Sequence, residues 1–184
     1  MRKKNKVILA LVVLAAVLFG VIQFGVIPAQ HRRQAAYDKA QTDALTHDIT
    51  SIEAFKSPYM GDASNTGALF YHLPLGNLPM TFQLDDQDCS LTVNYGDSVW
   101  HIGEEAALRD LVYNSVAAMA SIDNLTAVTY NFSGESYSFS RKRVESVFGA
   151  PLSDLLERDV WEEEVRDRLG SDDFITALCG ADLN

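Results

Sequence analysis

The feature that most constrains this chain is a run of 21 consecutive uncharged residues near its start, at positions 7–27. Fifteen of them are Val, Ile, Leu or Phe. A helix over the run would be about 31 Å long, and the hydrocarbon core of a bilayer is about 30 Å thick. The run therefore predicts a transmembrane helix.

A cleaved secretory signal is the alternative interpretation of this run. The apolar region of such a signal is normally about 7–15 residues long and ends at a site with the pattern small-x-small. Here the run is longer, it leads into Ile27, Pro28, Ala29 and Gln30, and no Cys follows that could carry a lipid. We therefore favour an uncleaved anchor, and a mature chain that begins near Gln30 would contradict this choice.

The charges that flank the run predict its orientation. Four cations precede it: Arg2, Lys3, Lys4 and Lys6. Such cations favour the cytoplasmic side, although His31, Arg32 and Arg33 on the other side weaken the asymmetry. We expect a single-pass protein of the cell membrane, with residues 1–6 in the cytoplasm and the rest of the chain outside it.

The outward part is strongly acidic. Residues 28–184 contain 11 Lys and Arg against 25 Asp and Glu, a net charge of −14. Nucleic acids and anionic lipid surfaces require basic patches, so we expect no nucleic-acid partner. The charge fits a domain that meets cationic partners or metal ions, or one whose charge serves solubility alone.

About 150 outward residues are enough for one domain with its own core. Cys89 and Cys179 lie far apart in the sequence. They could form one disulfide outside the cytoplasm, or both could be buried thiols. Neither shows the spacing of a metal site, and nothing in the sequence points to a cofactor.

Apolar spacing predicts a stalk helix after the anchor. Leu45, Ile49 and Ile52 recur at helical intervals within residues 31–56, Pro58 would stop that helix, and Pro28 would close the anchor. We therefore divide the chain into a basic tip (1–6), an anchor (7–27), a stalk helix (28–56), a domain (57–158) and a helical C-terminal extension (159–184).

Within the domain, helical and strand patterns alternate. Alternating apolar residues predict paired strands at 81–84 and 91–95, and again at 126–132 and 136–140 with a turn at Gly134. Residues 100–103 read as a loop or short strand. The helices are expected at 64–71 with Ser64 as N-cap, at 104–122, at 141–148 after Ser140, at 153–169, and after Ser171. This order predicts an α+β fold, with helices packed on a small antiparallel sheet.

Three segments carry a resemblance to a known family. Residues 55–65 (FKSPYMGDASN), 73–75 (LPL) and 91–95 (LTVNY) resemble the DUF4825 family, and the similarity extends over about residues 52–155. The resemblance implies a domain of unknown function on membrane-anchored proteins, mainly of Gram-positive bacteria, some of which accompany membrane peptidases or signalling genes. The family has no established catalytic residues to carry over.

The candidate binding residues are Tyr59, Gly61, Asp62 and Asn65. Gly61 permits a positive φ, and Asp62 and Asn65 can hydrogen-bond nearby backbone. The segment is therefore either a ligand-binding turn or a structural entry to the next helix, and the local backbone roles favour the structural interpretation.

Other chemically active residues form no constellation. Asp85, Asp86 and Asp88 lack the spacing of an EF-hand, which favours a solvated hairpin loop over a Ca²⁺ site. The four His residues are scattered, and no GxSxG or phosphate-binding glycine motif occurs. We expect a non-enzymatic binding or signalling module with a protein partner in the envelope. The alternative is a cell-envelope enzyme, or an accessory subunit of a membrane peptidase or signalling complex.

Overall fold

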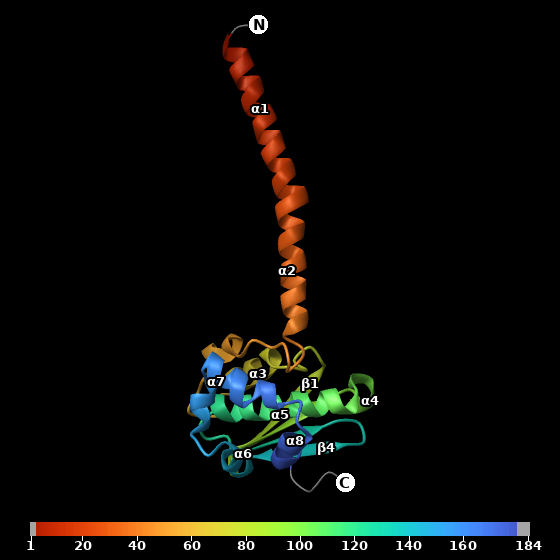
Figure 1. The fold of residues 1–184 in the computed structure, drawn as a ribbon, viewed down its shortest axis with the longest axis vertical. Coiled ribbons are helices and arrows are strands. Elements are labelled where there is room, and N and C mark those ends of the chain that lie inside the picture. Colours follow the sequence, from red (N-terminus) through yellow and green to blue (C-terminus); the bar gives the residue numbers. More distant parts are fainter. Residues whose placement is uncertain (1–2, 180–184) are drawn as a thin grey trace. The chain divides into compact units, whose positions relative to one another are not determined.

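The computed structural model describes residues 3–179 of the chain. The chain divides into two compact units, one from Met1 to Ala40 and one from Gln41 onward (Figure 1).

The first unit is a helical rod that contains the apolar run. Its helix comprises α1 (Lys3–Val21), a π-helical turn η1 (Ile22–Val26) and α2 (Ile27–Ala40). Within it, Val7–Ala40 is long and apolar enough to cross a membrane, with a mean hydropathy of 2.9 over its most apolar window. None of that window is buried inside the protein, which is what a helix solvated by lipid requires.

The sequence predicted that Pro28 would end the helix, but the helix continues through it. A proline inside an α-helix lacks an N–H and clashes with the carbonyl four residues earlier. The π turn comes immediately before, where the Ile27 N–H donates to the Ile22 carbonyl five residues back. We attribute the continuation of the helix to this wider turn, a common way to accommodate such a clash.

The predicted stalk helix is also too long, because α2 ends at Ala40. Residues 41–55 belong to the second unit, where turns lead into a 3₁₀ helix, η2 (Ile49–Phe55). The backbone N–H of Ala44 donates to the buried Asp110 carboxyl at 2.8 Å, and Leu45 of the predicted stripe is 41% exposed. Tertiary contacts therefore replace the helical hydrogen bonds that periodicity alone suggested.

A four-stranded sheet forms one layer of the second unit. Its order is β1 (Met80–Asp85), β2 (Ser90–Tyr95), β3 (Ala127–Asn131) and β4 (Ser136–Ser140). The outer pairs β1–β2 and β3–β4 are antiparallel hairpins, and the inner pair β2–β3 is parallel. The α+β class is confirmed and the sheet is mostly antiparallel, with a parallel join that the sequence analysis did not foresee.

The parallel join follows from the connection between the hairpins. Parallel neighbours require a crossover, which is usually helical. Here the crossover consists of α4 (Val99–Ile102) and α5 (Glu104–Ser121). The segment at 100–103 is thus part of a helical turn capped by Ser98, whose Oγ accepts from the Trp100 N–H, rather than a loop or strand.

The long helix α5 is the centre of the core. Every residue from Asp110 to Ser121 is buried, and α5 runs along the sheet (Figure 1). The inward-facing side chains of alternate strand positions are buried in the same core, among them Leu91, Val93, Val128 and Tyr130. The Ser115 hydroxyl of α5 lies 3.2 Å from the Tyr130 hydroxyl of β3. The opposite face of the sheet presents small polar residues, the alternation expected of a sheet covered on one side.

The remaining helices pack around α5, and some of them also contact the sheet directly. They are α3 (Ala63–His72), α6 (Arg141–Phe148), η3 (Leu152–Leu156), α7 (Arg158–Glu164), η4 (Arg166–Arg168) and α8 (Asp172–Cys179). Gly149 ends α6 in the left-handed conformation (φ +64°), and Ser140, which precedes the helix, forms no side-chain cap. The helix expected at 153–169 is three short pieces, and their buried Leu155, Trp161 and Val165 all join the core.

The C-terminal extension therefore contributes to the same core as residues 57–158. Phe174, Ile175 and Leu178 of α8 are buried, and the Ser171 Oγ accepts from the Phe174 N–H, as predicted for the cap of this helix. Residues 180–184 of the predicted extension, and residues 1–2 of the predicted tip, lie outside the described residues.

Candidate functional site

A groove runs between two segments that are far apart in the sequence. Residues 46–56, which include η2, form one wall, and residues 156–166, which include α7, form the other. The groove consists of two adjoining cavities of about 200 Å³ and about 120 Å³ that share Ile49 and Arg158. We call it the η2–α7 groove.

His47 lies at the base of the larger cavity and is only 1% exposed. Its Nε2 lies 2.7 Å from the His72 carbonyl, which can only accept, so Nε2 carries a proton. Burial lowers the pKa of His47, with smaller opposing effects of the His72 carbonyl and Asp48. The ring is therefore neutral at pH 7, and Nδ1 accepts from the Tyr113 hydroxyl at 2.7 Å.

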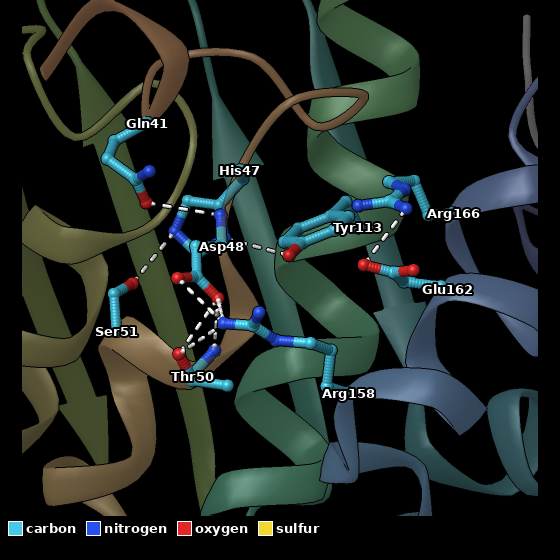
Figure 2. A network of polar contacts seen from close by, with 9 residues as sticks. All are labelled: Gln41, His47, Asp48, Thr50, Ser51, Tyr113, Arg158, Glu162 and Arg166. Carbon is cyan, nitrogen blue, oxygen red and sulfur yellow. Dashed lines mark hydrogen bonds and ion pairs between the residues drawn. The ribbon is translucent and has the colours of Figure 1, made fainter. Parts of the chain in front are cut away.

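This hydrogen bonding gives His47 a positional role. Both ring nitrogens are occupied, one by the carbonyl of His72 at the end of α3. The other contacts the Tyr113 side chain of α5 (Figure 2). The ring thus fixes the start of the 46–56 wall to two helices. It has no free nitrogen to exchange a proton with a bound ligand.

Asp48 and Arg158 join the two walls at the rim of the groove. The Arg158 Nη2 donates to both Asp48 carboxylate oxygens, at 3.0 and 3.2 Å, and to the Thr50 Oγ1 at 3.3 Å (Figure 2). Asp48 is also the N-cap of η2, accepting from the Thr50 N–H. Burial raises the pKa of Asp48, but the Thr50 hydrogen bonds and the Arg158 charge outweigh it and hold that pKa below its ordinary value.

A second ion pair and an aromatic contact complete the larger cavity. Arg166 and Glu162, one turn apart, are 3.1 Å from each other. Trp161 is buried against Tyr113, with ring centroids 4.8 Å apart in an edge-to-face arrangement. The Trp161 Nε1 makes no hydrogen bond within the described residues. Burial raises the pKa of the Tyr113 hydroxyl, and the nearby Trp161 side chain opposes that rise.

The groove combines an apolar floor with charged side chains. Its floor contains the buried side chains of Ile49, Ile52 and Trp161, and its lining also includes carboxylates and cations. Hydrogen-bonding groups above an apolar floor are the usual composition of a binding site. Within residues 3–179, no group of three or more His, Cys, Asp or Glu is placed to hold a metal ion.

The four candidate residues of the sequence analysis lie outside this groove. Tyr59 is 68% exposed. Gly61 does not adopt a positive φ, so the predicted reason for a glycine there is wrong, and an added Cβ would meet no atom within 4 Å. The N-cap of α3 is Asp62 rather than Ser64, because the Asp62 Oδ1 accepts from the Asn65 N–H at 3.0 Å.

These residues nevertheless support one wall of the groove. The Asn65 Nδ2 donates to the carbonyl of Phe55, the last residue of η2, at 2.8 Å. The Thr66 hydroxyl donates to the Met60 carbonyl, and the Met60 N–H donates to the Asn124 side chain. These bonds position the backbone where the chain enters α3.

The remaining candidates have local roles. The Asp85 Oδ1 accepts from the N–H groups of Gln87 and Asp88 and shapes the β1–β2 turn. Cys89 and Cys179 are free, partly buried thiols. Burial raises the pKa of Cys179 to about 11, so this thiol is protonated at neutral pH. His101 pairs with Asp97 at 2.6 Å on the surface of α4.

Sequence reasoning did not find the residues of the groove. Asp48 and Arg158 are 110 positions apart, and no spacing in the sequence connects them. The local signal that was available is the Asp48–Thr50 cap, which marks a helical start but not a site. His47 carries no signal of its own, because burial alone distinguishes it from the other three histidines.

Fold and groove together define a class: an α+β domain in a chain with a helix of membrane-spanning length. Residues 52–142 match the family model described as "Domain of unknown function (DUF4825)", so this chain carries a DUF4825 domain. No curated protein and no solved structure matches the chain significantly. The matched range includes most of η2 but ends before α7. One wall of the groove (residues 46–56) therefore lies partly within the DUF4825 match, and the other wall (residues 156–166) lies outside it.

Proposed function

We propose that this protein is a single-pass membrane protein whose domain from Gln41 onward lies outside the cytoplasm. In this proposal the domain is a recognition or signalling module that binds an envelope protein and catalyses no reaction. The 156–166 wall of the η2–α7 groove is held to the 46–56 wall by Arg158, and a partner segment occupies the space between them. The observation that carries the proposal is this preformed groove, with its apolar floor and charged rim.

The orientation rests on the four cations before the apolar run, which favour the cytoplasmic side. It is tested by labelling intact cells of a Gram-positive host with a membrane-impermeant maleimide. In a chain whose Cys89 and Cys179 are replaced by Ser, we expect Tyr59→Cys to be labelled in intact cells, since Tyr59 is exposed, and Asn5→Cys to be labelled only after permeabilisation. The reverse pattern would reject the orientation.

The binding role is tested by a photoreactive amino acid at Thr50, an exposed residue of the groove, in the full chain in living cells. The matched control is the same amino acid at Thr81, which is exposed on β1 and outside the groove. We expect a discrete crosslinked protein from position 50 and not from position 81. Equal capture from both positions would count against the groove, and release of a product from purified envelope by the protein would favour the enzymatic alternative.

A further inference from the structure

We infer that the smaller cavity of the η2–α7 groove receives a basic side chain, Lys or Arg, from the partner. The inference rests on the proposed binding role and adds to it the chemistry of the partner. The floor of the cavity, the charges at its rim and the charge of the whole domain support it.

The floor of the smaller cavity suits an aliphatic stem. Ile49 and Ile52 are 4% and 1% exposed and lie on the η2 side, and Leu156 lies on the other side. The cavity volume of about 120 Å³ admits one side chain rather than a helix. Lys and Arg commonly bury their methylene stems on apolar surface while the charged end stays at the rim.

The rim of the smaller cavity offers two carboxylates without partners. Glu53 comes from η2 and Glu157 from the start of α7, so one stands on each wall. Both side chains are exposed, and within the described residues neither forms an ion pair or a side-chain hydrogen bond. A cation between the walls would meet both of them.

Two cations of the chain itself line the same cavity. Arg158 is already engaged with both oxygens of Asp48, so its charge is largely compensated. Among residues 3–179 Lys56 forms no ion pair, and it is the competitor that a partner side chain must displace. Removal of Lys56 should therefore strengthen the binding of a basic side chain. If the cavity instead used Lys56 to attract an acidic partner, removal of Lys56 would weaken binding.

The charge of the whole domain favours the same sign of partner. Residues 41–184 contain 24 acidic and 8 basic residues. Such a field raises the association rate of cationic partners and slows anionic ones, and salt screens both effects. An acidic partner segment would have to approach against this field.

The test uses the full chain in nanodiscs of zwitterionic lipid, with fluorescent acetylated pentapeptides Ala-Ala-X-Ala-Ala in which X is Lys, Arg, norleucine or Glu. Norleucine keeps the aliphatic stem without the charge. We expect measurable binding only for the Lys and Arg peptides. These two peptides should bind the double variant Glu53→Gln/Glu157→Gln about fivefold more weakly, because the variant removes two exposed ion pairs. Lys56→Gln should bind them more tightly.

A charge-matched control separates the cavity from the general field. Glu163→Gln/Asp86→Asn removes the same number of charges from exposed positions that line neither cavity of the groove. We expect this variant to retain nearly the affinity of the unaltered chain. Equal weakening by both double variants, or preference for the norleucine peptide, would overturn the inference.

The two proposals fail in different ways. If position 50 captures a partner in cells but that partner's contact segment, mapped by mass spectrometry, contains no Lys or Arg, the binding role stands and the basic side chain is rejected. If lysine peptides bind at Glu53 and Glu157 but position 50 captures nothing in cells, the cavity chemistry stands and the envelope-protein role is rejected.

Discussion

Two buried ionisable side chains, Asp110 and His47, hold the segment after Ala40 against α5 and α3. Asp110 is 5% exposed and His47 is 1% exposed. Asp110 binds the Ala44 N–H, and His47 binds Tyr113 and the His72 carbonyl. Burial raises the pKa of Asp110 and lowers the pKa of His47, so the two residues make stability depend on pH with opposite signs.

Asp110 should destabilise the folded domain as pH rises. Burial, aided by the nearby Asp43 charge and opposed by the Ala44 hydrogen bond and Arg109, raises the pKa of Asp110 from 3.8 to about 7. The folded state therefore holds a proton that the unfolded state releases, and stability falls between about pH 4 and pH 7. Asp110→Asn should be roughly 2–4 kcal/mol more stable than the unaltered protein at pH 8, and similar to it at pH 4, by urea unfolding.

The control for this prediction is Asp86→Asn at an exposed position, which should leave the pH profile unchanged. A lower stability of Asp110→Asn at pH 8 would show that the charged carboxylate is required in the fold.

His47 should act in the opposite direction. Because burial lowers its pKa below 6.5, the unfolded state binds a proton first, and the stability that His47 contributes is lost as pH falls below 6.5. His47→Gln should cost about 1–3 kcal/mol at pH 7.5, where Tyr113 loses a well-placed partner, and less at pH 5. Thermal unfolding at both pH values checks this, and a cost independent of pH would contradict a neutral buried ring.

At the scale of elements, Arg141 closes the C-terminal end of α5. Its Nη2 donates to the carbonyls of Met119 and Ile122, both at 2.6 Å, and its Nε donates to the Leu125 carbonyl at 2.7 Å. The last carbonyls of a helix have no partners within it, and a cation there also interacts favourably with the helix dipole. One side chain from the start of α6 thus satisfies the end of the central core helix.

Replacement of Arg141 should therefore be costly for a residue that is partly exposed. Arg141→Ala should lower the free energy of unfolding by about 3 kcal/mol, because it removes charge-assisted hydrogen bonds and leaves carbonyls unpaired. Arg141→Lys should recover less than half of this loss, because a single ammonium cannot match the planar fork. Lys142→Ala, next to it, is the control for urea unfolding, and a similar small effect of all three changes would argue against the cap.

Elements with strong local periodicity were predictable, and those set by long-range contacts were not. The α5 helix and the four strands were predicted within one or two residues, since apolar spacing fixes which face is buried. The length of the helix after the anchor was not predictable, because the residue that bonds the Ala44 N–H, Asp110, lies 66 positions away in the sequence. The parallel pairing of β2 with β3 likewise depends on where the α4–α5 crossover returns the chain.

At the scale of the whole molecule, the core requires no residue of the rod. Every described residue of the hydrophobic core lies at or after Ala44. A chain that begins at Gln41 should therefore remain folded, stay in the aqueous phase without detergent and unfold within about 3 °C of the full chain, since loss of an exposed segment changes stability little. Circular dichroism and calorimetry check this, and unfolding of the truncated chain would show that the rod contributes to the fold.

The sequence by itself determined the membrane-length helix, the acidic domain, the α+β class and the DUF4825 resemblance. Each of these depends on composition or on patterns within a few neighbouring residues, which the chain carries before it folds. Only the tertiary structure decided the buried pair His47–Tyr113, the rim pair Asp48–Arg158 and the groove between residues 46–56 and 156–166. Those depend on packing that joins distant segments, and such packing leaves no local pattern in the sequence.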